Sequence, residues 1–214
     1  MRNDHLRWAG IGCALLAAVL TALVVAGWPP LLAYDVRVAR DLHAHALTHP
    51  GFTHLMRVLS DWVWDPWTMR ALAFTACVLL WWRGERVRAL RVALATLAAS
   101  AVQQGLKALV GRERPVWSDP VDSAQYAAYP SGHAMTATVV CGLLLWLLPR
   151  PAPAWAPAAW AVALVSVLGV GFTRVYLGVH WASDVLAGWL LGVAVLALAV
   201  CVPVRRGGSD PVER

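Results

Sequence analysis

The chain is organised around the segment Lys107–Asp184, which reads Lys107-x6-Arg114-Pro115, then Tyr129-Pro130-Ser131-Gly132-His133, then Thr173-Arg174-x5-His180-x3-Asp184. Each of these motifs adjoins an apolar run. Together they supply three cations, two histidines, a carboxylate and the start of a helix. Phosphate binding and phosphoryl transfer require groups of this kind. The segment therefore predicts a phosphate-transfer site at the edge of a membrane.

The cations of the first and third motifs are spaced to surround one phosphate. Lys107 and Arg114 are seven residues apart, about two turns of a helix, so both side chains can reach one pocket. Pro115 disfavours a helical Arg114 and is expected to end the helix there. Arg174 can add a two-pronged contact to phosphate oxygens. We interpret Lys107, Arg114 and Arg174 as phosphate-binding residues; the alternative is that they anchor helix ends at the membrane interface.

The middle motif marks the start of an apolar helix. Ser131 is a favourable N-cap residue, and a helix start presents free N–H groups and a positive dipole end to an anion. Gly132 allows the backbone to approach that anion closely. We expect Ser131 and Gly132 to bind phosphate, with His133 beside them. Ordinary helix capping next to an unrelated histidine is the alternative.

His180 and Asp184 are four residues apart and would share one face of a helix. A carboxylate that accepts the proton of one imidazole nitrogen fixes the tautomer and leaves the other nitrogen free to attack. An aspartate at the mouth of an apolar run is costly unless it is paired. We therefore interpret His180 as the nucleophile and Asp184 as its partner, with a purely structural polar pair as the alternative.

In order and spacing, the three motifs resemble those of the type 2 phosphatidic acid phosphatase family, which also includes vanadium haloperoxidases and bacterial acid phosphatases. The family pattern is K-x6-RP, PSGH and SR-x5-H-x3-D, and this chain has Thr173 where serine is usual. The resemblance implies that the Ser131 hydroxyl and the Gly132 amide hold phosphate, and that His133 is the general acid. It also implies that His180 forms a phosphohistidine. Thr173 keeps a hydroxyl, so we expect a minor effect.

The composition is typical of a membrane protein. Hydrophobic residues make up 59% of the chain and charged residues 14%, whereas a soluble domain has about 25% charged residues. The net charge of +6 does not indicate nucleic-acid binding, because no basic stripe interleaves with aromatic residues on a soluble face. Arginines in cytoplasmic loops and a cationic phosphate site account for that charge. The expected partners are the bilayer and a lipid phosphate.

Hydropathy predicts one all-α, membrane-embedded domain over residues 1–214, with six transmembrane helices. A cleaved signal peptide is the alternative for the first apolar run, but the run is long for a signal core, and Trp28-Pro29-Pro30 is a poor cleavage site. Residues 205–214 are expected to form a loose cytoplasmic tail. The spans are expected at about 9–27, 66–82, 92–107, 131–148, 158–172 and 185–204.

Residues 31–65 mix charged and apolar positions, which predicts short interfacial helices broken at Pro50-Gly51. Four histidines lie in this region: His43, His45, His49 and His54. A metal site there is conceivable, but no nearby cysteine or helical HExxH pattern supports one, and a wet loop tolerates histidines. We expect no metal and no cofactor, because the cations already neutralise the phosphate.

Six spans place both termini on one side of the membrane. Of the 18 Lys and Arg residues, ten fall on that side and eight on the other, or five without the motif residues Lys107, Arg114 and Arg174. This bias puts the termini in the cytoplasm and all three motifs at the extracytoplasmic face of the cell membrane. The ten are residues 2, 7, 83, 86, 88, 91, 150, 205, 206 and 214.

The motifs and the membrane setting together predict a metal-independent lipid phosphatase acting on a phosphomonoester or diphosphate. Phosphatidic acid, phosphatidylglycerol phosphate and undecaprenyl diphosphate all remain open as substrates by resemblance. A lipid phosphotransferase of the same fold would also pass through phosphohistidine, so the motifs leave the acceptor open. An anion-binding transporter is a further alternative, although the paired histidines would then be surplus. A haloperoxidase is disfavoured because those enzymes are soluble.

Overall fold

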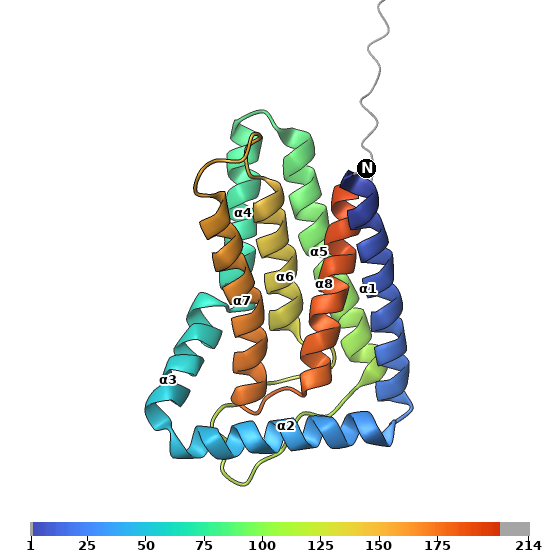
Figure 1. Ribbon diagram of the computed structural model, residues 1–214, viewed down its shortest axis with the longest axis vertical. Helices are drawn as coiled ribbons and strands as arrows, with labels where there is room; N and C mark the ends of the chain where they lie inside the picture. The colour runs from blue at the N-terminus through green and yellow to red at the C-terminus, as the bar shows by residue number, and fades with distance from the viewer. Residues whose placement is uncertain (1, 202–214) are drawn as a thin grey trace, which may run out of the picture.

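The computed structural model describes residues 2–201, and over this range the chain forms helices and no strand. The all-α prediction is therefore confirmed for the described residues. Figure 1 shows α1, α4, α5, α6, α7 and α8 side by side as an upright bundle, with α2 lying across one end. The elements are α1 (Arg2–Val25), α2 (Pro29–Thr48), α3 (Pro50–Val58), a π-helical turn (Leu59–Val63), α4 (Pro66–Trp82), α5 (Arg86–Val110), α6 (Gly132–Trp146), α7 (Ala156–Tyr176) and α8 (Ala182–Cys201).

Prolines and glycines set the ends of several helices. Pro29, Pro50 and Pro66 stand at the starts of α2, α3 and α4, where a missing N–H costs no intrahelical hydrogen bond. Before α4, the Asp65 carboxylate accepts from the backbone N–H of Trp67 at 2.7 Å. Gly111 ends α5 with φ +59°, a left-handed conformation that glycine adopts without steric cost. These signals explain why the chain turns where it does.

Each of the six stretches predicted as spans overlaps one helix of the bundle. Four of these helices are long and apolar enough to cross a membrane: α1 from Asp4, α5, α7 and α8. The other two are shorter, with 17 residues in α4 and 15 in α6. Helix α4 has the predicted bounds, whereas α5 runs from Arg86 to Val110, beyond both ends of the predicted 92–107. The predicted tail, and residues 202–204 of the last predicted span, lie outside the described residues.

Helix α8 packs most extensively against α1 and α6. The contact with α6 depends on small residues, because a Cβ at Gly188 would lie 2.7 Å from the Ser131 carbonyl oxygen and one at Gly192 would lie 2.7 Å from Thr138 Cβ. Close backbone approach of this kind is a common way for helices to associate in lipid, where apolar burial gives little driving force. The start of α6 is thereby held against the start of α8.

The outer surface of the bundle is strongly apolar. Phe74, Leu94, Val162 and Leu198 are each more than half exposed, on α4, α5, α7 and α8 respectively. A soluble monomer rarely exposes so much apolar surface. The buried core between α4, α5 and α6 is also apolar, so these helices are hydrophobic on most of their circumference. This arrangement is typical of a bundle surrounded by lipid.

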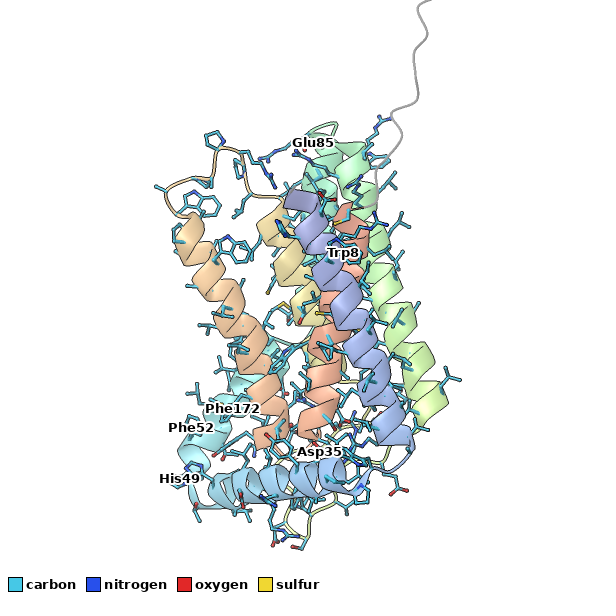
Figure 2. The ribbon with its side chains drawn as sticks, turned by 45° about the vertical axis from the view of Figure 1, so that its right-hand side comes forward. Trp8, Asp35, His49, Phe52, Glu85 and Phe172 are labelled. Atoms are coloured by element: carbon cyan, nitrogen blue, oxygen red, sulfur yellow. The ribbon has the colours of Figure 1, made fainter. Side chains whose placement is uncertain are left out.

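Helix α2 closes the end of the bundle at which α7 ends and α8 begins (Figure 1). With 20 residues it is longer than the short helices predicted for this region, because no helix breaker occurs between Pro30 and Pro50. The loop from residue 111 to residue 131 lies at the same end. Figure 2 shows Asp35 on the side of α2 that faces the bundle, and Trp8 and Glu85 near the opposite end.

Candidate active site

All eight predicted site residues lie at the end of the bundle that α2 covers. Lys107 comes from the last turn of α5 and Arg114 from the following loop. Ser131 precedes α6, and Gly132 and His133 open it. The third motif contributes Arg174 from the last turn of α7, His180 from the connection to α8, and Asp184 from the first turn of α8.

The His180 imidazole is buried and is held at both ring nitrogens. Nδ1 lies 3.2 Å from Asp184 Oδ2, and Nε2 lies 3.1 Å from Arg114 Nη1. Because a guanidinium can only donate, Nε2 must be the acceptor, which places the ring proton on Nδ1 facing the carboxylate. This is the tautomer that leaves a lone pair on Nε2 for attack.

His180 and Asp184 pair as predicted, but not across one face of a helix. Helix α8 begins at Ala182, so His180 lies before it and the two residues do not share a helix face. The turn supplies the contact in another way, because Asp184 Oδ2 also accepts from the backbone N–H of Trp181 at 2.9 Å. The carboxylate thus folds back over the residues that precede the helix.

Positive charge surrounds His180. Arg114 donates to the carbonyl oxygens of Val179 at 2.5 Å, Tyr126 at 2.9 Å and Gln125 at 3.0 Å. Burial and the neighbouring Arg174 lower the pKa of Arg114 to about 10, so its guanidinium remains charged at neutral pH. Burial and the charges of Arg114 and Arg174 lower the pKa of His180 well below 6.5, which keeps the imidazole neutral.

Lys107 and Arg114 converge as predicted, and Arg114 lies outside the helix as Pro115 indicated, but the helical spacing of two turns between them is not what brings them together. Gly111 ends α5 four residues after Lys107, so Arg114 lies on the loop. The loop folds back, and both side chains donate to the carbonyl oxygen of Ala127. The two cations are therefore brought to one place by loop geometry rather than by helical periodicity.

Ser131 occupies the N-cap position of α6 as predicted, and its side chain makes no capping hydrogen bond, so the alternative of ordinary helix capping by this side chain is not what the structure shows. Its backbone N–H instead donates to the carbonyl oxygen of Asp184 at 2.9 Å. Its Oγ is buried and has no hydrogen-bond partner among residues 2–201. Gly132 packs so closely on Gln103 that a Cβ would lie 2.4 Å from the amide nitrogen of that side chain.

Arg174 is buried and meets an acidic side of the site. Its Nη1 donates to Ser60 Oγ at 2.7 Å and lies 3.6 Å from Asp61 and 3.7 Å from Asp122. Burial and the nearby Asp122 raise the pKa of Asp61. Ser60 and Asp61 belong to the π-helical turn, a conformation that recurs at functional sites. Arg174 Nε is a second buried donor without a partner in the described part of the chain.

His133 is partly buried in the first turn of α6. Its ring lies within electrostatic reach of His180 and of the cations Arg174, Arg114 and Lys107. The two histidines and the three predicted phosphate-binding cations therefore form one cluster. Such a cluster can neutralise the oxygens of a phosphate and present one imidazole for attack and a second for proton transfer.

Two residues of the site were missed from the sequence. Arg112 lies 2.6 Å from Asp184 Oδ1 and 2.7 Å from Asp35 Oδ2, with Nη1 on the first and Nη2 on the second. The one available signal for Arg112 was a third cation between Lys107 and Arg114. Asp35 has no local signal, because it is one of several charges on α2 and meets the site only through the tertiary fold.

The four histidines of residues 31–65 have packing and surface roles in the structure. His43 stacks on Trp117 with ring centroids 4.0 Å apart, and His45 stacks on His49 at 3.8 Å. His45 Nδ1 also lies 3.1 Å from the Tyr176 hydroxyl. Within residues 2–201, no group of three His, Cys, Asp or Glu side chains is arranged to hold a metal ion.

The model of the PAP2 superfamily matches residues 88–207, which is more than half of the chain. The chain therefore belongs to the PAP2 superfamily, and the resemblance seen in the motifs is confirmed. The match includes every one of the predicted site residues, and it also includes Arg112.

Individual relatives are similar over shorter stretches. The undecaprenyl-diphosphatase of Sulfolobus acidocaldarius is 40% identical over 73 residues, which are 34% of this chain and 32% of that protein. Phosphatidylglycerophosphatase B of Bacillus subtilis is 34% identical over 112 residues, 51% of this chain and 52% of the relative. The matches thus span about a third to a half of the length of these relatives.

The fold is shared with a solved membrane protein. The crystal structure of a transmembrane PAP2-type phosphatidylglycerolphosphate phosphatase from Bacillus subtilis superimposes with a TM-score of 0.71 at 22% identity. The superposition covers 90% of this chain and 94% of that one. The bundle of apolar helices is therefore the fold of a transmembrane protein.

Proposed function

We propose that this chain is a single-domain integral-membrane lipid phosphatase that hydrolyses a phosphomonoester or diphosphate through a phosphohistidine. The observation that carries the proposal is the His180 ring, whose Nδ1 faces Asp184 at 3.2 Å while Nε2 accepts from Arg114 at 3.1 Å. The relatives named as phosphatases of undecaprenyl diphosphate and phosphatidylglycerophosphate support the class of substrate. Phosphatidic acid is the third candidate.

The substrate phosphate docks on Lys107, Arg114 and Arg174, whose charges neutralise its oxygens. The buried and unpartnered Ser131 Oγ and Arg174 Nε support this docking, because buried polar groups require hydrogen-bond partners and phosphate oxygens can supply them. The Gly132 amide, at the start of α6, adds a backbone donor. Phosphate then lies between the guanidinium of Arg114 and the imidazole of His180.

In the first chemical step, His180 Nε2 forms a bond to phosphorus while the bond to the leaving oxygen breaks. Protonated His133 gives its proton to that oxygen, and Asp184 stabilises the positive charge that develops on His180. In the second step, neutral His133 takes a proton from water, and the oxygen of that water displaces His180 from phosphorus. Inorganic phosphate leaves, and His133 is protonated again.

We place six helices across the cell membrane, α1, α4, α5, α6, α7 and α8, with both termini in the cytoplasm. The arginine bias and the apolar outer surface of the bundle support this topology. The site then lies at the extracytoplasmic face, beneath α2, which lies along the interface. No metal is required, because three fixed cations already offset the charge of the phosphate.

The test is a phosphate-release assay with purified protein in detergent, on phosphatidic acid, phosphatidylglycerol phosphate and undecaprenyl diphosphate, with excess chelator in a parallel set. We expect release from at least one lipid in chelator, and acid-labile phosphate trapped on the wild-type protein. His180→Ala should lower kcat on the order of a thousandfold or more. His54→Ala, at an exposed histidine of α3, is the matched control.

Substantial turnover by well-folded His180→Ala protein would contradict the nucleophile, and activity restored only by magnesium would contradict the mechanism. Binding of all three lipids without phosphate release would favour an anion-binding transporter. Transfer of the phosphate to a lipid hydroxyl, seen by product analysis, would favour a phosphotransferase.

A further inference from the structure

The Asp184 carboxylate is connected to helix α2 through a single buried guanidinium. Arg112 Nη1 lies 2.6 Å from Asp184 Oδ1, and Arg112 Nη2 lies 2.7 Å from Asp35 Oδ2. The side chains of Asp35 and Asp184 are 1% and 0% exposed, and that of Arg112 is 11% exposed. Two parallel N–H groups of one planar fork thus hold two carboxylates that are 149 positions apart in the sequence, as the numbers 35 and 184 show.

Asp35 also fixes the first turn of α8. Its Oδ1 accepts from the backbone N–H of Ser183 at 2.9 Å, and its Oδ2 accepts from the Ser183 hydroxyl. A free N–H at the start of a helix is stabilised by a carboxylate, which also interacts favourably with the helix dipole. Asp35 therefore caps α8 from another helix. It does so at Ser183, the residue that precedes Asp184.

Every oxygen of the Asp184 side chain is committed. Oδ1 accepts from Arg112, and Oδ2 accepts from the Trp181 N–H at 2.9 Å and faces His180 Nδ1 at 3.2 Å. Rotation of this carboxylate would break at least one of these bonds. The direction in which Asp184 points, and so the orientation of the His180 ring, depends on the position of Arg112.

Arg112 differs from the other cations of the site in what it contacts. Both of its terminal nitrogens are engaged by carboxylates, and Nη1 also donates to Ser183 Oγ at 2.7 Å. Its guanidinium lies over the Trp181 ring, 5.6 Å from the centroid. Arg114, by contrast, contacts backbone carbonyls and His180 Nε2, and Arg174 contacts a hydroxyl and two carboxylates at 3.6 Å and 3.7 Å. Arg112 has little capacity left for a phosphate.

We propose that Asp35 and Arg112 are positioning residues for the nucleophile: Asp35 on α2 holds Arg112, Arg112 holds Asp184, and Asp184 orients His180. The inference rests on the phosphohistidine mechanism proposed above and extends it to a helix outside the three motifs. In metal sites, residues that orient a ligating histidine through a carboxylate typically change affinity or activity by about 10–100-fold when replaced. A similar effect is expected here, on the chemical step rather than on phosphate binding.

The test compares Asp35→Asn, Arg112→Gln and the double variant Asp35→Asn/Arg112→Gln, in the purified full chain, on the best lipid of the phosphate-release assay. Asp35→Asn should lower kcat and the rate of phosphohistidine formation about 10–100-fold. KM and inhibition by vanadate should stay within about twofold of wild type, because the phosphate-binding residues are unchanged. Asp41→Asn, an exposed acid on the same helix, is the control and should leave all these values unchanged.

We call the chain of contacts from Asp35 through Arg112 and Asp184 to His180 the relay. The double variant distinguishes this relay from two independent effects of Asp35 and Arg112. If Asp35 acts through Arg112, the kcat of the double variant should equal that of Arg112→Gln alone, because the contact with Arg112 is already lost and the amide oxygen of Asn at position 35 can still accept from the Ser183 N–H. The double variant removes both charges of the Asp35–Arg112 pair, so neither is left buried without its partner. It should therefore fold even if Asp35→Asn does not, and the test can still be made.

Three results would overturn the relay: a kcat of Asp35→Asn within twofold of wild type, losses that multiply in the double variant, or a parallel loss of vanadate affinity. The last result would place Arg112 on the phosphate. A wild-type protein that never forms phosphohistidine would overturn the proposed function and the relay with it. Phosphohistidine formed at the wild-type rate by Asp35→Asn would overturn the relay alone.

Discussion

As the proposed nucleophile, His180 must meet two requirements that usually oppose each other. Its imidazole must be neutral to attack phosphorus, and it must become positively charged as the bond forms. Burial and the surrounding cations keep it neutral, whereas Asp184 at 3.2 Å stabilises the charge that develops. The Asp184 carboxylate and the Arg114 guanidinium lie at opposite nitrogens of one ring, so each requirement is served by a separate contact.

The lowered pKa of His180 predicts how activity depends on pH. Protonation removes the attacking lone pair of His180. Because the pKa of His180 is well below 6.5, the imidazole stays neutral as the pH falls through 6.5, and activity is lost only at lower pH. The acid limb of kcat/KM should therefore have its midpoint below pH 6.5. A ³¹P titration of the lipid identifies any limb that belongs to the substrate.

The Arg114→Gln variant should shift the acid limb of the pH profile in a defined direction. Arg114→Gln removes a positive charge beside Nε2, which makes the imidazolium less unfavourable and raises the pKa of His180. Its residual activity should show the acid limb at a higher pH than wild type. An unchanged limb, or one that moves to lower pH, would show that another group is titrating.

The motifs predicted which residues would converge but not the geometry by which they do so. Arg114 was expected outside the helix because of Pro115, but the motif spacing did not predict the loop that folds it back beside Lys107. Ser131 was expected at the N-cap position, which it occupies, but its lack of a side-chain capping bond was not predicted. The spacing of the motifs therefore identifies which residues form the site, but it does not determine the backbone conformation that brings them together.

Asp35 and Arg112 escaped prediction for a different physical reason. Their contact joins residues 77 positions apart, and nothing in the sequence around either one indicates a buried partner. On α2, Asp35 looks like any charge on an amphipathic helix. Long-range pairing of this kind depends on how α2 crosses the bundle, which neither hydropathy nor local spacing determines.

Among the helices, α6 and α8 are the pair on which the site depends most directly. Their starts supply Ser131, Gly132 and Asp184, and Gly188 allows them to approach. A Cβ at Gly188 would lie 2.7 Å from the Ser131 carbonyl oxygen and 3.0 Å from Ala134 Cβ. The first of these is a backbone atom, so it can give way only if α6 moves.

Gly188→Ala should therefore destabilise the protein by about 1–3 kcal/mol and also reduce activity, because it shifts the backbone that holds Ser131. The measurements are thermal unfolding in detergent and kcat on the preferred lipid. Gly12→Ala on α1 is the matched control, since a Cβ there meets no atom within 4 Å and alanine favours a helix. Equal stability of the two variants would show that α6 and α8 tolerate a wider separation.

Considered as a whole, the protein has a polar end that carries the site and an opposite end rich in arginine. The proposed topology predicts that the loop from residue 111 to residue 131 faces outside the cytoplasm. Cysteine at Ser123, which is exposed, should react with an impermeant thiol reagent in intact cells, above the background of the native cysteines. Cysteine at the exposed Ala152, in the α6–α7 loop, should react only after permeabilisation. The reverse pattern would invert the topology.

The position of the site also predicts a preference for substrates that remain in the bilayer. Lys107, Arg174 and Asp184 all lie in the end turns of apolar helices, so the phosphate should meet them at the headgroup level. Each buried methylene of an acyl chain contributes about 0.8 kcal/mol to membrane binding.

Long-chain phosphatidic acid should accordingly show a kcat/KM about tenfold or more above that of its short-chain, water-soluble counterpart in the same detergent. The two compounds share one headgroup, so the comparison isolates the chain. Equal efficiency on both would mean that the site recognises the phosphate without help from the membrane.

The packing of α1 against α8 constrains how the protein can be made. A Cβ at Gly10 would lie 2.3 Å from Ala197 Cβ, so these helices touch closely, and Leu20 of α1 is buried beside Ala187 of α8. Because α1 precedes α8 in the chain, the ribosome releases α1 before α8. Until α8 has been made, α1 lies without this neighbour, and Asp35 lies without Ser183 and Asp184. The proposed nucleophile can therefore be oriented only after α8 has inserted.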